Sequence, residues 1–144
     1  PLATSSERQR QVNPRKVYPV DAALIPAFDR SGKANLGHAL ETAVLIELER
    51  RGCELGYLFT PNGFEVDFLA TEADGGRTLI QVAADLSDKT TREREFRALA
   101  DALPARRGAQ ALLLTLTGSD VRAALADAPA GVTVRTVWEW MLEE

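Results

Sequence analysis

Two neighbouring stretches decide the expected fold: GFEVDFLA at residues 63–70 and TLIQVA at residues 78–83. Both alternate between apolar and polar side chains, which is typical of β-strands. Strict alternation predicts two faces for the first strand, with Phe64, Val66, Phe68 and Ala70 on one and Glu65, Asp67 and Leu69 on the other. In the second strand, Gln81 shares a face with Leu79, opposite Ile80 and Val82. We therefore expect two adjacent strands in which the side chains of Asp67 and Gln81 meet.

The segments around these strands predict an α/β domain in which a mixed central sheet is flanked by helices. Gly52 follows a helical segment at the position favoured for a left-handed C-cap. Pro61-Asn62-Gly63 joins two strand-like segments and is a hairpin signal. The apolar run 109–116 is typical of a strand covered on both faces. The full expected order is helix 34–51, strands 55–60, 64–70 and 78–83, a helix from Thr90 or Thr91 to Leu103, strand 109–116, a short helix capped by Ser119, strand 132–134 and helix 137–142.

Length and composition fit one soluble globular domain. The 144 residues are 45% hydrophobic and 26% charged, which is ordinary for such a domain. No apolar run approaches the roughly 18 residues of a membrane span, so we expect no membrane partner and a cytoplasmic location. The single cysteine, Cys53, excludes an internal disulfide and a cysteine zinc cluster, and the single histidine, His38, excludes a histidine-rich metal cage. Any metal would therefore be bound by oxygen atoms.

The ends and the charge give two further expectations. Residues 1–14 are polar without periodicity and are interpreted as a linker remnant, which leaves residues 15–144 as the domain. Because the sequence does not begin with methionine, we expect it to continue a longer protein whose other part lies upstream. A net charge of -4 argues against a surface that binds nucleic acid throughout. Basic clusters at 8–16 and 92–97 leave local phosphate contacts open beside the simpler explanation of solvated faces.

Glu41 is predicted at the centre of an apolar helix face. At about 100° per residue, the residues within about 60° of it are apolar or small, namely Gly37, Val44, Leu45 and Leu48. A buried glutamate costs several kcal/mol unless it is paired, protonated or bound to a cation. Two explanations stay open: a hydrogen bond to the core backbone or a basic side chain, and a site carboxylate near Asp67 and Gln81.

Glu41, Asp67 and Gln81 would together supply two carboxylates and one amide. Oxygen ligands of this kind suit Mg²⁺ or Mn²⁺ in octahedral geometry. The alternative is that Glu65 and Asp67 only solvate the open face of an edge strand, and the spacing fits both interpretations equally well.

Other candidate residues fit a site less well. His38 lies about 60° from Glu41 around the helix and is predicted to be a boundary side chain rather than a base. Cys53 has no histidine nearby in sequence and is not expected to be a nucleophile. The segment 138–141, with two tryptophans and a methionine, is predicted to seal the core as an amphipathic helix. Because no Walker-type glycine loop is present, ATP would bind only in the upstream part.

Four segments together resemble the carboxy-terminal domain of a family of bacterial and archaeal AAA-type ATPases: PRKVYPVD at 14–21, GHALE at 37–41, GFEVDFL at 63–69 and LIQV at 79–82. That domain is related to the PD-(D/E)XK nucleases. The resemblance implies a restriction-endonuclease-like αβββαβ core, an upstream ATPase domain in the same protein and DNA as a candidate partner. It also implies that Glu41 resembles the helix glutamate, Asp67 the metal-binding aspartate and Gln81 the Glu or Gln of the third strand.

Ala83 occupies the position where this superfamily has lysine. There the metal acidifies the attacking water, while the lysine orients the nucleophile and offsets developing charge. Loss of such a group costs on the order of 10²- to 10³-fold in rate. Lys89 is a candidate replacement, although a lysine in a polar loop is more simply solvated. Gln81 adds no charge to hold a metal.

We therefore expect the non-ATPase module of a larger ATPase, with a degenerate nuclease-like site that serves recognition of nucleic acid or protein. One alternative is a metal-dependent DNA endonuclease in which Glu41, Asp67 and Gln81 bind Mg²⁺ or Mn²⁺. The other is a purely structural packing module, which would bind neither metal nor nucleic acid. Enzymatic activity is left open, with an inactive or weak nuclease favoured because of Ala83.

Overall fold

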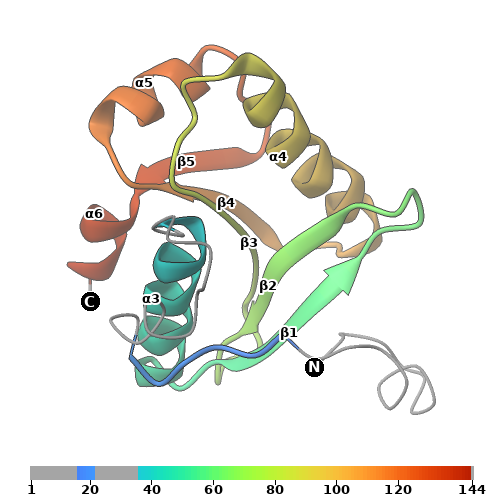
Figure 1. Ribbon diagram of the computed structural model, residues 1–144. Coiled ribbons are helices and arrows are strands. Elements are labelled where there is room, and N and C mark those ends of the chain that lie inside the picture. Colours follow the sequence, from blue (N-terminus) through green and yellow to red (C-terminus); the bar gives the residue numbers. More distant parts are fainter. Residues whose placement is uncertain (1–15, 22–35, 144) are drawn as a thin grey trace.

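A single mixed sheet is the centre of the computed structural model, which describes residues 16–21 and 36–143 (Figure 1). Within these residues the sheet has five strands in the order β1-β2-β3-β4-β5. The first two pairings, β1–β2 and β2–β3, are antiparallel, whereas β3–β4 and β4–β5 are parallel. The strands are β1 Glu54–Phe59, β2 Glu65–Thr71, β3 Arg77–Ala83, β4 Gln110–Thr115 and β5 Val132–Thr136.

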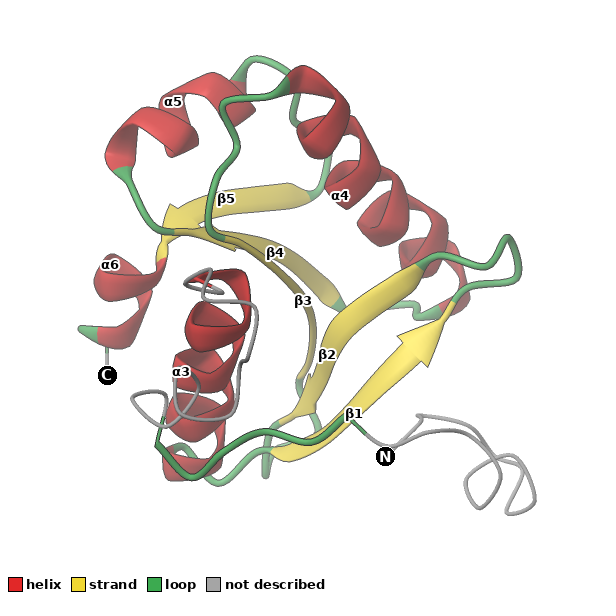
Figure 2. Cartoon of the chain, in the orientation of Figure 1, coloured by secondary structure: helices red, strands yellow, loops and turns green. Residues whose placement is uncertain are grey.

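Helices cover both faces of this sheet (Figure 2). Parallel neighbours need a crossover connection, and α4 and α5 provide the two crossovers on one face. On the other face lie α3 and α6. The helices are α3 Leu36–Arg50, α4 Lys89–Ala102, α5 Gly118–Leu125 and α6 Val137–Met141, with a 3₁₀ turn at Leu103–Ala105. The predicted α/β class and the αβββαβ order, with a mixed sheet between helices, are confirmed.

The core is divided by the sheet into two apolar clusters. Ala111 and Leu113 of β4 pack with the residues under α4, while Leu112 and Leu114 pack with those under α3. β4 is therefore buried on both faces, which explains its continuous apolar sequence and confirms that prediction. In the described part of the chain, no helix has both the length and the apolar character of a membrane span.

Side-chain caps shift the helix boundaries from the predicted ones. α4 begins at Lys89 rather than at Thr90 or Thr91, because the Asp88 carboxylate accepts a hydrogen bond from the Thr91 N–H at 2.8 Å. Thr117, rather than Ser119, caps α5 by accepting from the Asp120 N–H. Gly52 and Gly63 have the predicted positive φ, at 72° and 83°. The predicted linker at 1–14 and helix start at Ala34 lie outside the described residues.

A β-bulge interrupts the alternation of β2. In the pairing with β1, Gly56 lies opposite Leu69 and Leu58 lies opposite Val66. One residue of β1 therefore faces two residues of β2, and the extra residue changes which way the following side chains point. The bulge falls on Asp67-Phe68.

The predicted faces of β2 are therefore wrong in part. Val66 packs together with Leu69 in the cluster under α4, whereas Phe68 and Ala70 pack in the cluster under α3. Strict alternation placed Val66 with Phe68 and Ala70 instead. Because of the bulge, the consecutive residues Asp67 and Phe68 both reach side chains on the α3 face, namely Lys16 and Tyr18.

Glu47, a buried residue of α3, connects this helix to the carboxy-terminal helix. Its carboxylate accepts hydrogen bonds from Arg50 at 2.7 and 2.8 Å and from Arg51 at 2.7 Å. The Arg51 guanidinium also donates to the Trp140 carbonyl at 2.8 Å and stacks 4.5 Å from the indole centroid. Trp140 is buried as predicted for the helix that seals the core, whereas Trp138 is largely exposed.

Glu47→Gln should lower the free energy of unfolding at neutral pH by about 1 kcal/mol, because a charge-assisted contact to two arginines is weakened. Hydrogen bonds from Arg50 outweigh the opposing effect of burial and, together with Arg51, lower the pKa of Glu47 from 4.5 to about 2. The stabilisation is thus present above pH 4.5 and is lost as the pH falls towards 2. Urea unfolding at neutral and acidic pH should show the gap between parent and variant shrinking on acidification. The control is Glu49→Gln, an exposed glutamate of the same helix, and a gap independent of pH would contradict the assignment.

Candidate functional site

A solvent-open hollow of about 730 Å³ lies where α3, the β2–β3 pair and α4 meet. All three predicted site residues, Glu41, Asp67 and Gln81, line it. Lys16 and Tyr18, from the described segment that precedes α3, line it as well. The hollow therefore collects polar side chains from four separate parts of the chain.

The hollow forms where β2 and β3 stop pairing. Their regular register extends only as far as Phe68 opposite Ile80. Beyond this point the Asp67 N–H donates to Oε1 of Gln81 at 3.3 Å, and the Val82 N–H donates to Oδ2 of Asp67 at 3.0 Å. A buried N–H without an acceptor costs about 1–3 kcal/mol. Asp67 and Gln81 thus each satisfy a backbone donor that the sheet leaves open.

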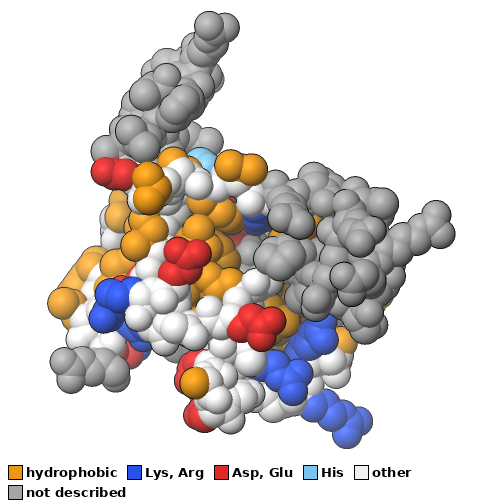
Figure 3. All heavy atoms as spheres, turned by 90° about the horizontal axis from the view of Figure 1, so that it is seen from below, with side chains coloured by type: hydrophobic (Ala, Val, Ile, Leu, Met, Phe, Trp, Pro, Cys, Tyr) orange, Lys and Arg blue, Asp and Glu red, His pale blue; other side chains and the backbone are white. Residues whose placement is uncertain are grey.

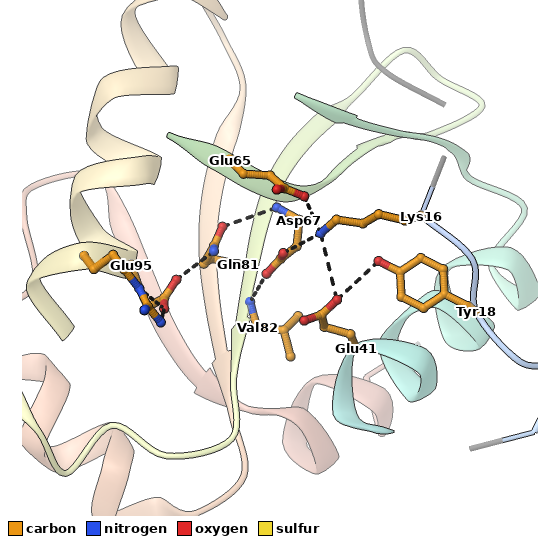
Figure 4. A network of polar contacts seen from close by, with 9 residues as sticks. Lys16, Tyr18, Glu41, Glu65, Asp67, Gln81, Val82 and Glu95 are labelled. Atoms are coloured by element: carbon orange, nitrogen blue, oxygen red, sulfur yellow. Dashed lines mark hydrogen bonds and ion pairs between the residues drawn. The ribbon is translucent and has the colours of Figure 1, made fainter. Parts of the chain in front are cut away.

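The Gln81 side chain is held from its other end by α4. Its Nε2 donates to Oε2 of Glu95 at 2.7 Å, and the second oxygen of Glu95 accepts from the Arg94 guanidinium at 2.7 Å. Glu95 is 5% exposed. With its oxygen and its nitrogen both engaged, the Gln81 amide has a fixed orientation and does not point towards Glu41 (Figure 4).

Lys16 supplies an ammonium group between three carboxylates (Figure 4). Its Nζ lies 2.8 Å from Oδ1 of Asp67, 2.7 Å from Oε1 of Glu65 and 3.9 Å from Oε2 of Glu41. All these groups are partly buried, so their interactions are screened less than those of exposed ion pairs. Because one ammonium faces three carboxylates, the site is short of positive charge when all three are ionised.

Tyr18 fixes the same segment against α3 and β2. Its hydroxyl donates to Oε2 of Glu41 at 3.3 Å. Its ring stacks on His38 at 5.5 Å between centroids and lies 6.0 Å from the ring of Phe68. His38 is therefore in contact with an aromatic ring at the border of the site, which agrees with its predicted position as a boundary side chain.

The electrostatic environment favours protons on the acids. Burial, followed by the Asp67 charge, raises the pKa of Glu41 to about 7, against the opposing influence of Lys16. Burial also raises the pKa of Asp67, although Lys16 and the Val82 N–H act in the other direction. Burial disfavours the Lys16 ammonium, but Asp67 and Glu65 outweigh this and raise the pKa of Lys16. The lysine is accordingly charged at neutral pH, whereas Glu41 is partly protonated.

The predicted convergence of three side chains holds only in part. Glu41 and Asp67 contact the same ammonium, whereas Gln81 contacts the backbone of Asp67 and the side chain of Glu95. Glu41 also lies at the border of the buried stripe, with its side chain 23% exposed, and not at the centre. The fully packed positions of α3 are instead Leu40, Val44 and Leu48. A basic side chain compensates Glu41, as one of the two explanations expected.

The residues that concern the missing lysine are placed clearly. Ala83 is 8% exposed and packs in the cluster under α4. Lys89 lies 3.7 Å from Glu93, and its side chain is 69% exposed. It does not line the hollow. The ammonium in the site thus comes from Lys16 and not from Lys89, the candidate weighed from the sequence.

Sequence reasoning missed Lys16, Tyr18 and Glu95 as parts of this site. Glu95 had a usable signal, because it shares the i, i+3, i+4 and i+7 stripe of α4 with buried apolar residues at 98, 99 and 102. Lys16 and Tyr18 lie in a short segment without periodicity, so no local pattern pointed to the hollow.

Among the described residues, no three His, Cys, Asp or Glu side chains are grouped so that they could hold a metal ion. Comparisons with protein-family models, curated proteins and solved structures found no match. The fold and the site therefore define an α/β domain with a buried lysine–carboxylate cluster at the break between two strands.

Gln81→Ala should lower the free energy of unfolding by about 1–3 kcal/mol, because the Asp67 N–H loses its acceptor and Glu95 loses its donor. Gln81→Glu keeps the acceptor for Asp67 but places a second carboxylate against Glu95. It should be destabilising at neutral pH and recover as the pH falls, since repulsion raises the pKa of the pair and one proton relieves it. Chemical unfolding at several pH values measures both effects.

The matched control for these variants is Gln110→Ala, which changes an exposed glutamine at the start of β4. Equal stability of Gln81→Ala and Gln110→Ala would show that the contacts of Gln81 carry no net stabilisation.

Proposed function

We propose that this domain is a nuclease-like module that does not cleave DNA efficiently and that recognises a nucleic acid or a protein for an ATPase domain located upstream in the same cytoplasmic protein. The observation that carries the proposal is the position of the Lys16 ammonium. It lies among the carboxylates themselves, while Ala83 leaves the usual lysine position without a charge.

The arrangement of elements supports the nuclease-like half of the proposal. Glu41 comes from α3, Asp67 from β2 and Gln81 from β3, and all three line one hollow. This matches the helix, strand and strand origins that the resemblance to PD-(D/E)XK domains implies for a helix glutamate, an aspartate and a Glu or Gln.

The contacts in the hollow do not fit a bound Mg²⁺ or Mn²⁺ as they stand. Metal–oxygen distances of about 2.0–2.2 Å would require the metal to take the place of the Lys16 ammonium. Gln81 has both ends of its amide engaged by other groups. The site is thus degenerate in the sense that its ligands are committed to protein contacts.

The surface fits selective recognition rather than general binding to phosphates. Acidic and basic side chains both occur among apolar ones on the face seen in Figure 3, and the whole chain carries a net charge of -4. Arg94 is 71% exposed at the rim of the hollow and offers a local contact for an acidic or phosphate-bearing partner.

The test is cleavage of supercoiled, branched and single-stranded DNA with Mg²⁺ or Mn²⁺. Parent protein should cleave poorly or not at all, and Ala83→Lys should not restore a normal rate. The new side chain would start from a packed position under α4, and Gln81 would still add no charge to the site. Binding of the same DNA, measured by fluorescence anisotropy, separates recognition from cleavage.

Robust cleavage by the parent that is lost in Asp67→Asn and Glu41→Gln would overturn the proposal. These two substitutions keep an oxygen acceptor for Val82 and for Tyr18, so loss of activity would not merely report unfolding. Glu49→Gln is the matched control.

A metal-dependent endonuclease is the second candidate, and one contact favours it. The Lys16 ammonium lies 2.8 Å from Asp67 and would replace the charge that Ala83 lacks. In that case Lys16→Met should abolish cleavage, while Lys89→Met should leave it unchanged. The third candidate, a packing module, draws support from the hydrogen bonds that Asp67 and Gln81 make to the backbone, and it predicts no DNA binding.

A further inference from the structure

We infer that the Lys16 ammonium and a divalent cation compete for the same carboxylates, so that residues 16–21 form a strap that must lift before the site takes a metal. The inference rests on the proposed function, because it concerns control of the same hollow.

The first argument is geometric. The ammonium touches Asp67 and Glu65 at 2.8 and 2.7 Å and lies 3.9 Å from Glu41. A divalent cation would need oxygen atoms from this set at about 2.0–2.2 Å, and it would lie against the ammonium at a distance where two positive charges repel. Lysine and metal therefore exclude one another.

The second argument is the balance of charge. Glu41, Glu65 and Asp67 can carry three negative charges, and Lys16 supplies one positive charge to them. A divalent cation carries two and would neutralise the group more completely. The carboxylates thus provide a net attraction for a metal once the lysine has left, and the lysine weakens that attraction while it stays.

The third argument is the way in which the strap is attached. Lys16 and Tyr18 turn their side chains into the hollow, whereas Val17 and Val20 are 80% and 86% exposed. Tyr18 lies at the margin of the cluster under α3 and is only partly buried. Lifting the strap would break ion pairs and one aromatic contact but would leave the sheet and its two clusters intact.

Glu41 links the two attachments. It accepts the Tyr18 hydroxyl at 3.3 Å and lies near the Lys16 ammonium through the same oxygen, Oε2. A metal bound to this oxygen would draw Glu41 away from both residues. Metal loading and release of the strap are therefore coupled through one side chain.

The experiment is Mn²⁺ binding by calorimetry to the full chain and to three variants. Lys16→Met should bind one Mn²⁺ at least about tenfold more tightly than the parent, because a like charge is removed from the site. Tyr18→Phe, which frees Glu41 from the hydroxyl but keeps the lysine, should fall between them. Lys89→Met removes an exposed lysine outside the hollow and should match the parent.

Equal Mn²⁺ affinity in Lys16→Met and the parent would overturn the inference. Circular dichroism checks that each variant is folded, and Lys16→Gln replaces Lys16→Met in the same comparison if the methionine variant is not. Tighter binding that is lost again in Lys16→Met combined with Glu41→Gln supports the assignment to this site. Tighter binding unaffected by Glu41→Gln contradicts it.

Cleavage assays on the same proteins keep the two ideas apart. Tighter Mn²⁺ binding without cleavage supports both the strap and the proposed recognition function. Efficient cleavage by the parent would refute the proposed function, while the comparison of affinities would still decide whether Lys16 competes with the metal.

Discussion

The separation of β2 from β3 is the constraint on which the site depends. Once the ladder stops after Phe68 and Ile80, two buried N–H groups need acceptors, and Asp67 and Gln81 supply them. Each unsatisfied donor would cost about 1–3 kcal/mol, a large share of the roughly 5–15 kcal/mol that stabilises a domain. The backbone therefore fixes these two side chains in place whether or not any ligand binds.

The carboxylate of Asp67 serves two purposes through its two oxygens. One oxygen accepts from the Val82 N–H within the sheet, and the other faces Lys16 in the hollow. A structural role and a functional role are thus compatible in the same residue, and loss of Asp67 alone cannot distinguish them. Glu41 accepts only the Tyr18 hydroxyl among the side-chain hydrogen bonds described here, so it reports on the hollow with less effect on the sheet.

Local signals in the sequence were sufficient for much of the fold. The glycines at 52 and 63 and the apolar run of β4 were placed correctly because each depends on nearby residues alone. The site was predicted only in part, because its contacts join distant segments. Lys16 pairs with Asp67 across 51 positions of the chain, and no periodicity in residues 16–21 points to that partner. The border position of Glu41 depends likewise on how α3 packs, which helical spacing does not define.

The bulge in β2 changes the phase of the strand at its most important residue. Asp67 and Phe68 are consecutive, yet both face α3, so the aspartate stands out of step with the apolar positions that follow it. A search pattern that requires strict alternation through the acidic residue would pass over domains built in this way. A pattern that allows two consecutive inward positions, one acidic and one aromatic, would retain them, and a one-residue deletion at this point would turn the acid away from the lysine.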